Sequence, residues 1–78
     1  MYYSYILKLN NGKYYMGHSS DLRTRMNEHS HGRVAATKNF LPIKLIYYSA
    51  FLSLNKAIAF EKYLKSSSGF AFRNKHLI

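Results

Sequence analysis

The chain has 78 residues and no cysteine, so we expect residues 1–78 to form one small domain, and disulfides and thiolate metal sites are excluded. Twelve Lys and Arg residues face three acids, which gives a formal charge of +9. Such an excess favours a polyanionic partner, and nucleic acid fits better than a membrane because the sequence has no basic amphipathic helix with a broad apolar face.

The amino terminus and the acid count limit location and chemistry. The chain begins Met-Tyr-Tyr-Ser-Tyr-Ile, which is typical of a strand and lacks the charged-then-apolar order of a signal peptide. No apolar run approaches the roughly 20 residues that span a bilayer, so we expect a cytoplasmic protein. Three acids are too few for a two-metal site, and a metal enzyme with this sequence would use one ion on one carboxylate.

The first half of the chain predicts a β-hairpin followed by a helix. Residues 3–9 and 13–17 carry the aromatic and branched side chains of strands, and Asn-Asn-Gly at 10–12 is a turn signal. Ser-Ser-Asp at 19–21 starts a helix with a hydroxyl cap and an early acid, and the helix ends near Gly32.

The second half predicts a loop, a strand and two helices. Residues 33–42 are polar and end at a proline, which indicates a loop. Residues 43–51 are almost continuously apolar, which favours a central strand covered on both faces. A serine-capped helix follows over 54–65, and Ser-Ser-Ser-Gly at 66–69 breaks it before a short final helix. The predicted order is β-β-α-β-α-α, an α+β domain with helices packed on a three-stranded sheet.

Two registers are possible for the hairpin. A two-residue turn pairs Tyr5 with His18, and Tyr5 and Tyr15 then point to opposite faces of the sheet. A three-residue loop with a glycine bulge pairs Tyr5 with Gly17, and the two tyrosines then share a face. The sequence leaves both registers open.

Glu61 is the first residue that packing does not explain. At about 100° per residue, it falls inside the apolar face of the helix predicted over 54–65. A carboxylate at a core edge is costly unless it is paired or binds a cation. Glu61 is therefore a candidate metal ligand, and the structural alternative is an ion pair with Lys65 or Arg25.

Arg25 and His29 form the second anomaly. They are four residues apart on the first predicted helix, so they stack one turn above another, beside its short apolar stripe. Two such groups at the core edge indicate an anion site. In the alternative interpretation, Arg25 bonds Asp21 or Glu28 on its own helix, and His29 interacts with the negative end of the helix dipole.

The order and spacing of Tyr5, Tyr15, Gly17, Arg25, His29 and Glu61 resemble those of the motifs of the GIY-YIG nuclease superfamily. The chain looks most similar to small stand-alone proteins related to the amino-terminal nuclease domain of the excision-repair excinuclease. The likeness covers essentially the whole chain. Its motifs are Tyr5-Ile6-Leu7-Lys8, Tyr15-Met16-Gly17, Asp21-Leu22-Arg23-Thr24-Arg25-Met26-Asn27-Glu28-His29 and Glu61-Lys62-Tyr63-Leu64-Lys65.

The resemblance implies a three-stranded antiparallel sheet flanked by helices and a role for each motif residue. Tyr5 would act near the attacking water as general base or relay, and Tyr15 would position the phosphate or the water. Arg25 would stabilise the developing charge on the phosphate, and His29 would be a proton acceptor. Glu61 would bind one divalent ion, Mg²⁺ or Mn²⁺.

These inferences predict a metal-dependent endonuclease that hydrolyses nucleic acid, with DNA favoured over RNA. The alternative is a nucleic-acid-binding module of the same fold without catalysis. Substrate specificity would come from the substrate's shape, a protein partner or a homo-oligomer, because the domain has no room for a second recognition module. Residues expected to contact the nucleic acid outside the catalytic set are His18, Arg23, Lys38 and Lys65.

Overall fold

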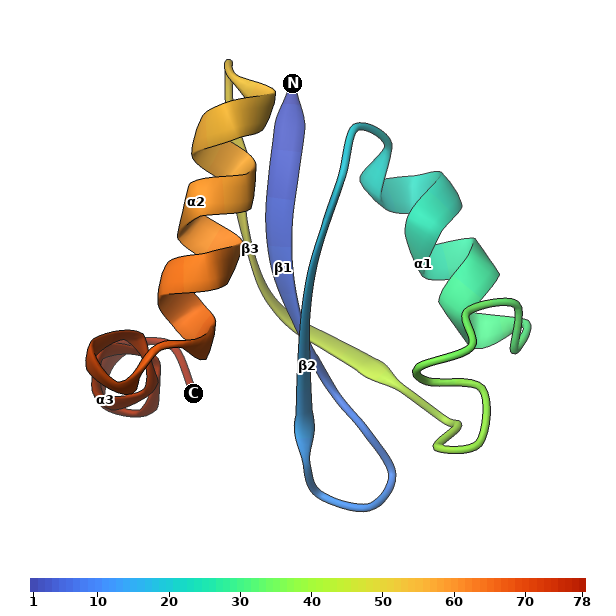
Figure 1. The fold of residues 1–78 in the computed structure, drawn as a ribbon. Helices are drawn as coiled ribbons and strands as arrows, with labels where there is room; N and C mark the ends of the chain where they lie inside the picture. Colours follow the sequence, from blue (N-terminus) through green and yellow to red (C-terminus); the bar gives the residue numbers. More distant parts are fainter.

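The computed structural model describes all 78 residues as a three-stranded antiparallel sheet with three helices. The strands lie in the order β2-β1-β3, and α1 lies on the opposite side of the sheet from α2 and α3 (Figure 1). This arrangement confirms the predicted fold class and element order. The elements along the chain are β1 (Tyr2–Lys8), β2 (Tyr14–Ser19), α1 (Leu22–Ser30), β3 (Lys44–Phe51), α2 (Leu54–Lys65) and α3 (Ser67–His76).

The hairpin adopts the register in which Tyr5 faces Gly17. The Leu9 amide donates to the Lys13 carbonyl over 2.8 Å, so the loop between them has three residues. Gly12 has a φ of +83°, the left-handed conformation that closes such a loop and that favours glycine. Because the side chains of a strand alternate, this register puts Tyr5 and Tyr15 on one face of the sheet.

β1 is the central strand, and its two faces contact different helices. Residues 4–7 are buried. The Ser4 hydroxyl donates to the Ala57 carbonyl of α2, and the Tyr5 hydroxyl contacts His29 of α1. The expectation that residues 43–51 form a strand covered on both faces is wrong, because β3 is an edge strand and Tyr48 is 53% exposed. Aromatic rings fill a half-exposed strand as readily as a covered one, so the apolar run did not discriminate between them.

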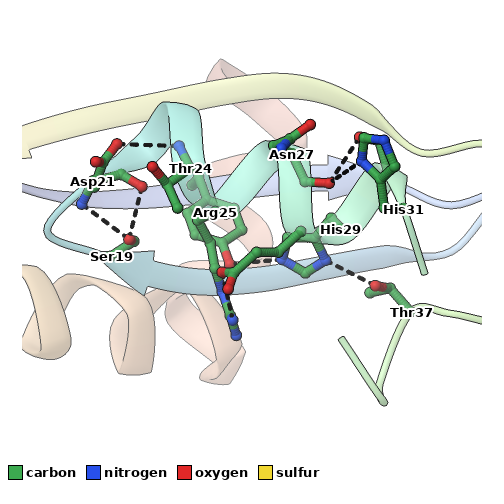
Figure 2. A network of polar contacts seen from close by, with 11 residues as sticks. Ser19, Asp21, Thr24, Arg25, Asn27, His29, His31 and Thr37 are labelled. Carbon is green, nitrogen blue, oxygen red and sulfur yellow. Dashed lines mark hydrogen bonds and ion pairs between the residues drawn. The ribbon is translucent and has the colours of Figure 1, made fainter. Parts of the chain in front are cut away.

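The turn from β2 into α1 differs from the prediction in two respects. β2 continues to Ser19, two residues beyond the expected end, and this extension brings His18 into the sheet. The cap of α1 is the Asp21 carboxylate, which accepts from the Thr24 amide at 3.1 Å, and not a serine hydroxyl. The Ser19 hydroxyl instead accepts the Asp21 amide, which fixes the entry to the helix (Figure 2).

α2 and α3 are separated by Ser66 alone, so the expected break over residues 66–69 is wrong. The Ser66 hydroxyl donates to the Tyr63 carbonyl at 2.6 Å and accepts from the Gly69 amide at 3.1 Å, so it closes one helix and caps the next. Gly69 lies inside α3, where a Cβ atom would overlap the Tyr63 carbonyl. The glycine permits close helix packing and does not end a helix. None of the three helices has the length and hydrophobicity that a bilayer-spanning segment needs.

Candidate active site

The edge strand β2 lies between the two groups of predicted site residues. Tyr15 is on the face that α1 covers, where its ring centroid is 5.4 Å from that of His29. His18 is on the other face and contacts Glu61 of α2. Gly17 lies between Tyr15 and His18, opposite Tyr5. The structure therefore brings the predicted residues to both sides of one short stretch of an open strand edge.

A buried hydrogen-bonded chain links β1, α1 and the loop after α1. The Tyr5 hydroxyl lies 2.9 Å from Nε2 of His29, and Nδ1 of the same ring lies 2.8 Å from the Thr37 hydroxyl. Tyr5, His29 and Thr37 are all fully buried. Figure 2 shows the His29 ring reaching from α1, with Thr37 at its far nitrogen. A neutral imidazole donates through one nitrogen and accepts through the other, so both contacts are satisfied together.

Burial keeps the tyrosine and the histidine neutral. Desolvation lowers the pKa of His29, the positive charge of Arg25 lowers it further, and Glu28 opposes these effects. Desolvation raises the pKa of Tyr5, and this effect exceeds the lowering by the guanidinium of Arg25. At neutral pH the pair is a phenol beside a neutral imidazole, and a free phenolate is not available as the base.

Gly17 is required by the position of the Tyr5 ring. A Cβ atom at this position would be 2.5 Å from the Tyr5 hydroxyl oxygen, 2.6 Å from Cζ and 3.1 Å from Cε1 of Tyr15. The first two distances are below any normal van der Waals contact. Only glycine lets the Tyr5 hydroxyl pass over β2 and reach His29 without displacement.

Arg25 forms an ion pair on its own helix, and the phenol of Tyr5 influences its pKa. Its Nη1 lies 3.3 Å from Oε1 of Glu28, as the structural alternative predicts. Hydrogen bonding to Tyr5 is the largest influence on the guanidinium and raises the pKa of Arg25, against an opposing effect of burial. Figure 2 shows the Arg25 side chain extending from α1 toward the sheet beside His29. Its side chain is 34% exposed, so the group can also contact a ligand.

Glu61 is ionised and has two hydrogen-bond partners. Its Oε1 accepts from Nδ1 of His18 at 2.7 Å, and its Oε2 accepts from Nζ of Lys65 at 2.8 Å. Burial raises the pKa of Glu61, but the hydrogen bonds from Lys65 and His18 lower it more, and the net pKa is below the usual range. The Glu61 charge also raises the pKa of Tyr5, so the two groups interact electrostatically across the strand.

The Glu61 carboxylate retains acceptor capacity for a metal ion. Each oxygen has two lone-pair positions and uses one, so one position on each oxygen stays available. No three His or acidic side chains gather anywhere in the chain. The donor set therefore fits an ion such as Mg²⁺, which commonly binds one or two carboxylates and takes its remaining ligands from water and substrate phosphates.

The four residues expected to contact nucleic acid outside the catalytic set divide into two pairs. Arg23 and Lys38 are exposed and have no carboxylate partner. His18 and Lys65 both bind Glu61. Of the twelve Lys and Arg residues, only Arg25 and Lys65 lie within ion-pair distance of a carboxylate. The remaining cations are exposed and available to a polyanion, with the exception of the buried Arg73.

Sequence reasoning missed two contacts of this site. Thr37 orients the His29 ring from a loop of mixed composition, and no spacing signal marks it. His18 contacts Glu61 because β2 continues past Gly17, and strand alternation carried one residue further would have placed it on the face of α2.

Known proteins with related sequences place the chain in a family. The model of the GIY-YIG catalytic domain matches residues 1–75. A UPF0213 protein of Streptococcus pneumoniae serotype 4 is 41% identical over 64 residues, which cover 81% of this chain and 65% of the relative, just under two thirds of its length. A UPF0213 protein of Streptococcus agalactiae serotype V is 36% identical over 67 residues, which cover 85% of this chain and 76% of the relative.

A solved structure has the same fold. The solution NMR structure of a UPF0213 protein from Bacillus halodurans superposes with a TM-score of 0.59 at 28% identity, over 96% of this chain and 84% of that chain. The family match extends over nearly the whole sequence and includes every motif residue from Tyr5 to Glu61. This chain belongs to the GIY-YIG nuclease superfamily.

Proposed function

We propose that this protein is a metal-dependent endonuclease that hydrolyses phosphodiester bonds, with DNA favoured over RNA and one divalent ion at Glu61. The observation that carries the proposal is the arrangement around β2: Arg25 lies on α1, on the side of the sheet where Tyr5 contacts His29, and Glu61 contacts His18 on the other side. A phosphate at the Gly17 edge would lie between a cation and a metal-binding carboxylate. The preference for DNA rests on the likeness to the excision-repair nuclease domain.

The protein groups have distinct tasks in this mechanism. Arg25 donates to the nonbridging oxygens of the phosphate and stabilises the charge that develops on them. Tyr5 receives the proton of the attacking water as its own hydroxyl proton passes to Nε2 of His29, which is neutral and 2.9 Å away. Thr37 holds the imidazole in orientation through Nδ1. A divalent ion, Mg²⁺ or Mn²⁺, bound at Glu61 supplies Lewis-acid stabilisation of the leaving oxygen.

This relay explains how a buried tyrosine can serve as a base. The pKa of Tyr5 is raised, so a preformed phenolate is rare at neutral pH. In a relay the tyrosine gives up its proton as it takes one from water, and the net acceptor is His29. Desolvation and Arg25 keep His29 unprotonated and ready to accept. Tyr15, whose ring contacts both residues, positions the phosphate or the water.

A cleavage assay on two substrates tests the proposal. Supercoiled plasmid and structured RNA are incubated with the protein in Mg²⁺, Mn²⁺ or chelator. We expect metal-dependent nicking of the plasmid. The nicking rate should fall about 10²–10³-fold in Arg25→Met, the loss typical of removing one transition-state donor. Nicking should also be lost in Glu61→Gln. Retention of DNA without cleavage in any metal would instead support a binding module. Equal nicking in wild type and both variants would indicate a contaminating nuclease.

A further inference from the structure

Arg73 in α3 is a buried cation without an anionic partner. The residue is 7% exposed, and its guanidinium carbon lies 4.6 Å from the ring centroid of Phe70 and 5.4 Å from that of Tyr14. Its Nε and Nη1 atoms are enclosed and have no hydrogen-bond partner. Nη2 is not among these enclosed atoms and has no hydrogen-bond partner in the chain. The side chain therefore presents a single donor atom to the surface.

The carboxylates of the chain do not neutralise this charge. Asp21 caps α1, Glu28 pairs with Arg25, and Glu61 pairs with His18 and Lys65. An arginine keeps its proton when buried, so its desolvation must be offset by other interactions. The two rings contribute cation–π attraction, and the carboxyl end of α3 contributes its dipole. Neither supplies a negative charge, and an external anion at Nη2 would.

The position of Arg73 relates it to the candidate active site. Tyr14 and His18 point to the same face of β2, the face that α2 covers, because residues of a strand alternate. Four residues of strand separate them by about 13 Å. Arg73 packs on Tyr14 at one end of this row, and Glu61 contacts His18 at the other. A nucleic acid that follows the open edge of β2 would pass both groups.

We propose that Arg73, supported by Tyr14 and Phe70, is a second phosphate-binding site that contacts the substrate backbone several nucleotides from the scissile bond. This inference rests on the proposed nucleic-acid substrate. Nη2 donates to a nonbridging phosphate oxygen, and the two rings hold the guanidinium in place. The substrate phosphate supplies the counter-charge that the chain itself lacks.

The salt dependence of binding tests this assignment. Binding of a labelled DNA duplex is measured in chelator, where no cleavage occurs, over a series of salt concentrations. We expect Arg73→Met to reduce the slope of log affinity against log salt by about 0.9, the value of one phosphate contact on B-form DNA. The matched control is Lys44→Met, which removes one exposed charge from β3, the opposite edge of the sheet. It should change the slope much less.

Two results would overturn the assignment. If Arg73 only holds α3 against β2, Arg73→Met changes the melting temperature but leaves the slope as in wild type. Equal slope changes in Arg73→Met and Lys44→Met would reflect net charge alone. Should Arg73→Met not fold, the Nε–H resonance of Arg73 in the wild-type protein is followed by NMR during duplex titration, and an unshifted resonance excludes contact.

This test also separates the second site from the proposed catalysis. Binding with a reduced slope in Arg73→Met, together with no cleavage by wild type, would support the phosphate site and reject the nuclease. Metal-dependent cleavage with an unchanged slope in Arg73→Met would support the nuclease and reject the site.

Discussion

Replacing Gly17 by alanine probes the contact that fixes the Tyr5 hydroxyl. The added methyl group would lie 2.5 Å from that oxygen and 2.6 Å from Cζ. Because the oxygen and the ring carbon are both too close, a rotation of the hydroxyl cannot relieve the overlap, and the ring or β2 must shift. Such a shift lengthens the 2.9 Å contact between Tyr5 and Nε2 of His29.

The size of the effect follows from these contacts. Overpacking of a buried site costs typically 1–3 kcal/mol, so we expect a loss of about 2 kcal/mol in the free energy of unfolding. For a domain of this size, that loss lowers the melting temperature by roughly 8–16 °C. A displacement of catalytic groups by about 1 Å can reduce a rate about 10²-fold, so cleavage should fall by a similar factor even where Gly17→Ala is fully folded.

Thermal denaturation and single-turnover cleavage well below the melting temperature measure the two effects. The matched control is Gly12→Ala, which has no atom within 4 Å of the added methyl group but has a left-handed backbone at φ +83°. It should lose about 1 kcal/mol of stability through backbone strain and keep its cleavage rate. Wild-type stability and rate in Gly17→Ala, or an equal loss of rate in Gly12→Ala, would refute the reasoning.

Four further predictions concern His29 and the junction of α2 and α3. The pKa of His29, followed by its ring proton resonances, should lie below the ordinary 6.5 and rise in Arg25→Met, since one cause of its depression is removed; an unchanged pKa would contradict the assigned coupling. The imidazole of His29 is protonated at a higher pH in the unfolded chain than in the folded protein. The stability that His29 contributes is therefore complete above pH 6.5 and is lost as the pH falls toward the folded pKa. Urea denaturation at several pH values should detect this loss. Gly69→Ala should destabilise by more than about 3 kcal/mol, because its methyl group would overlap the Tyr63 carbonyl of the backbone, and a normal melting temperature would show that α3 does not pack there. Ser66→Ala should cost about 1 kcal/mol through loss of the α3 cap, and no measurable change in urea denaturation would count against that cap.

Much of the fold could be predicted because local chemistry determined it. The Asn-Asn-Gly turn, the strand composition and the cap at Ser53 each act within a few residues, and the structure has a hairpin and a helix where they indicate. The position of β3 could not be predicted in this way. Whether a strand lies at the centre or the edge depends on which strands pair, and β1 pairs on both sides through contacts distant in sequence.

In the candidate site too, features set by local sequence could be predicted and features set by tertiary contacts could not. Helical spacing identified Arg25, His29 and Glu61 as unusual, and the register of the hairpin decided that Tyr5 and Tyr15 share a face. The partners of these groups depend on tertiary structure. Lys65 is one helical turn from Glu61 and was predictable, whereas the His29–Thr37 bond joins a helix to an irregular loop. The catalytic roles of these residues stay predictions, and the variants above test those of Arg25 and Glu61 directly.

The central claim is that Arg25 and Glu61, from opposite faces of β2, act on the same phosphate in one transition state. A double-mutant cycle on the single-turnover cleavage rate, with Arg25→Met, Glu61→Gln and the double variant in saturating Mg²⁺, measures this most directly. Residues that act as a unit are strongly non-additive, so we expect the double variant to cleave about as slowly as the slower single variant. Independent, multiplying losses, or a wild-type rate in Glu61→Gln, would contradict the account.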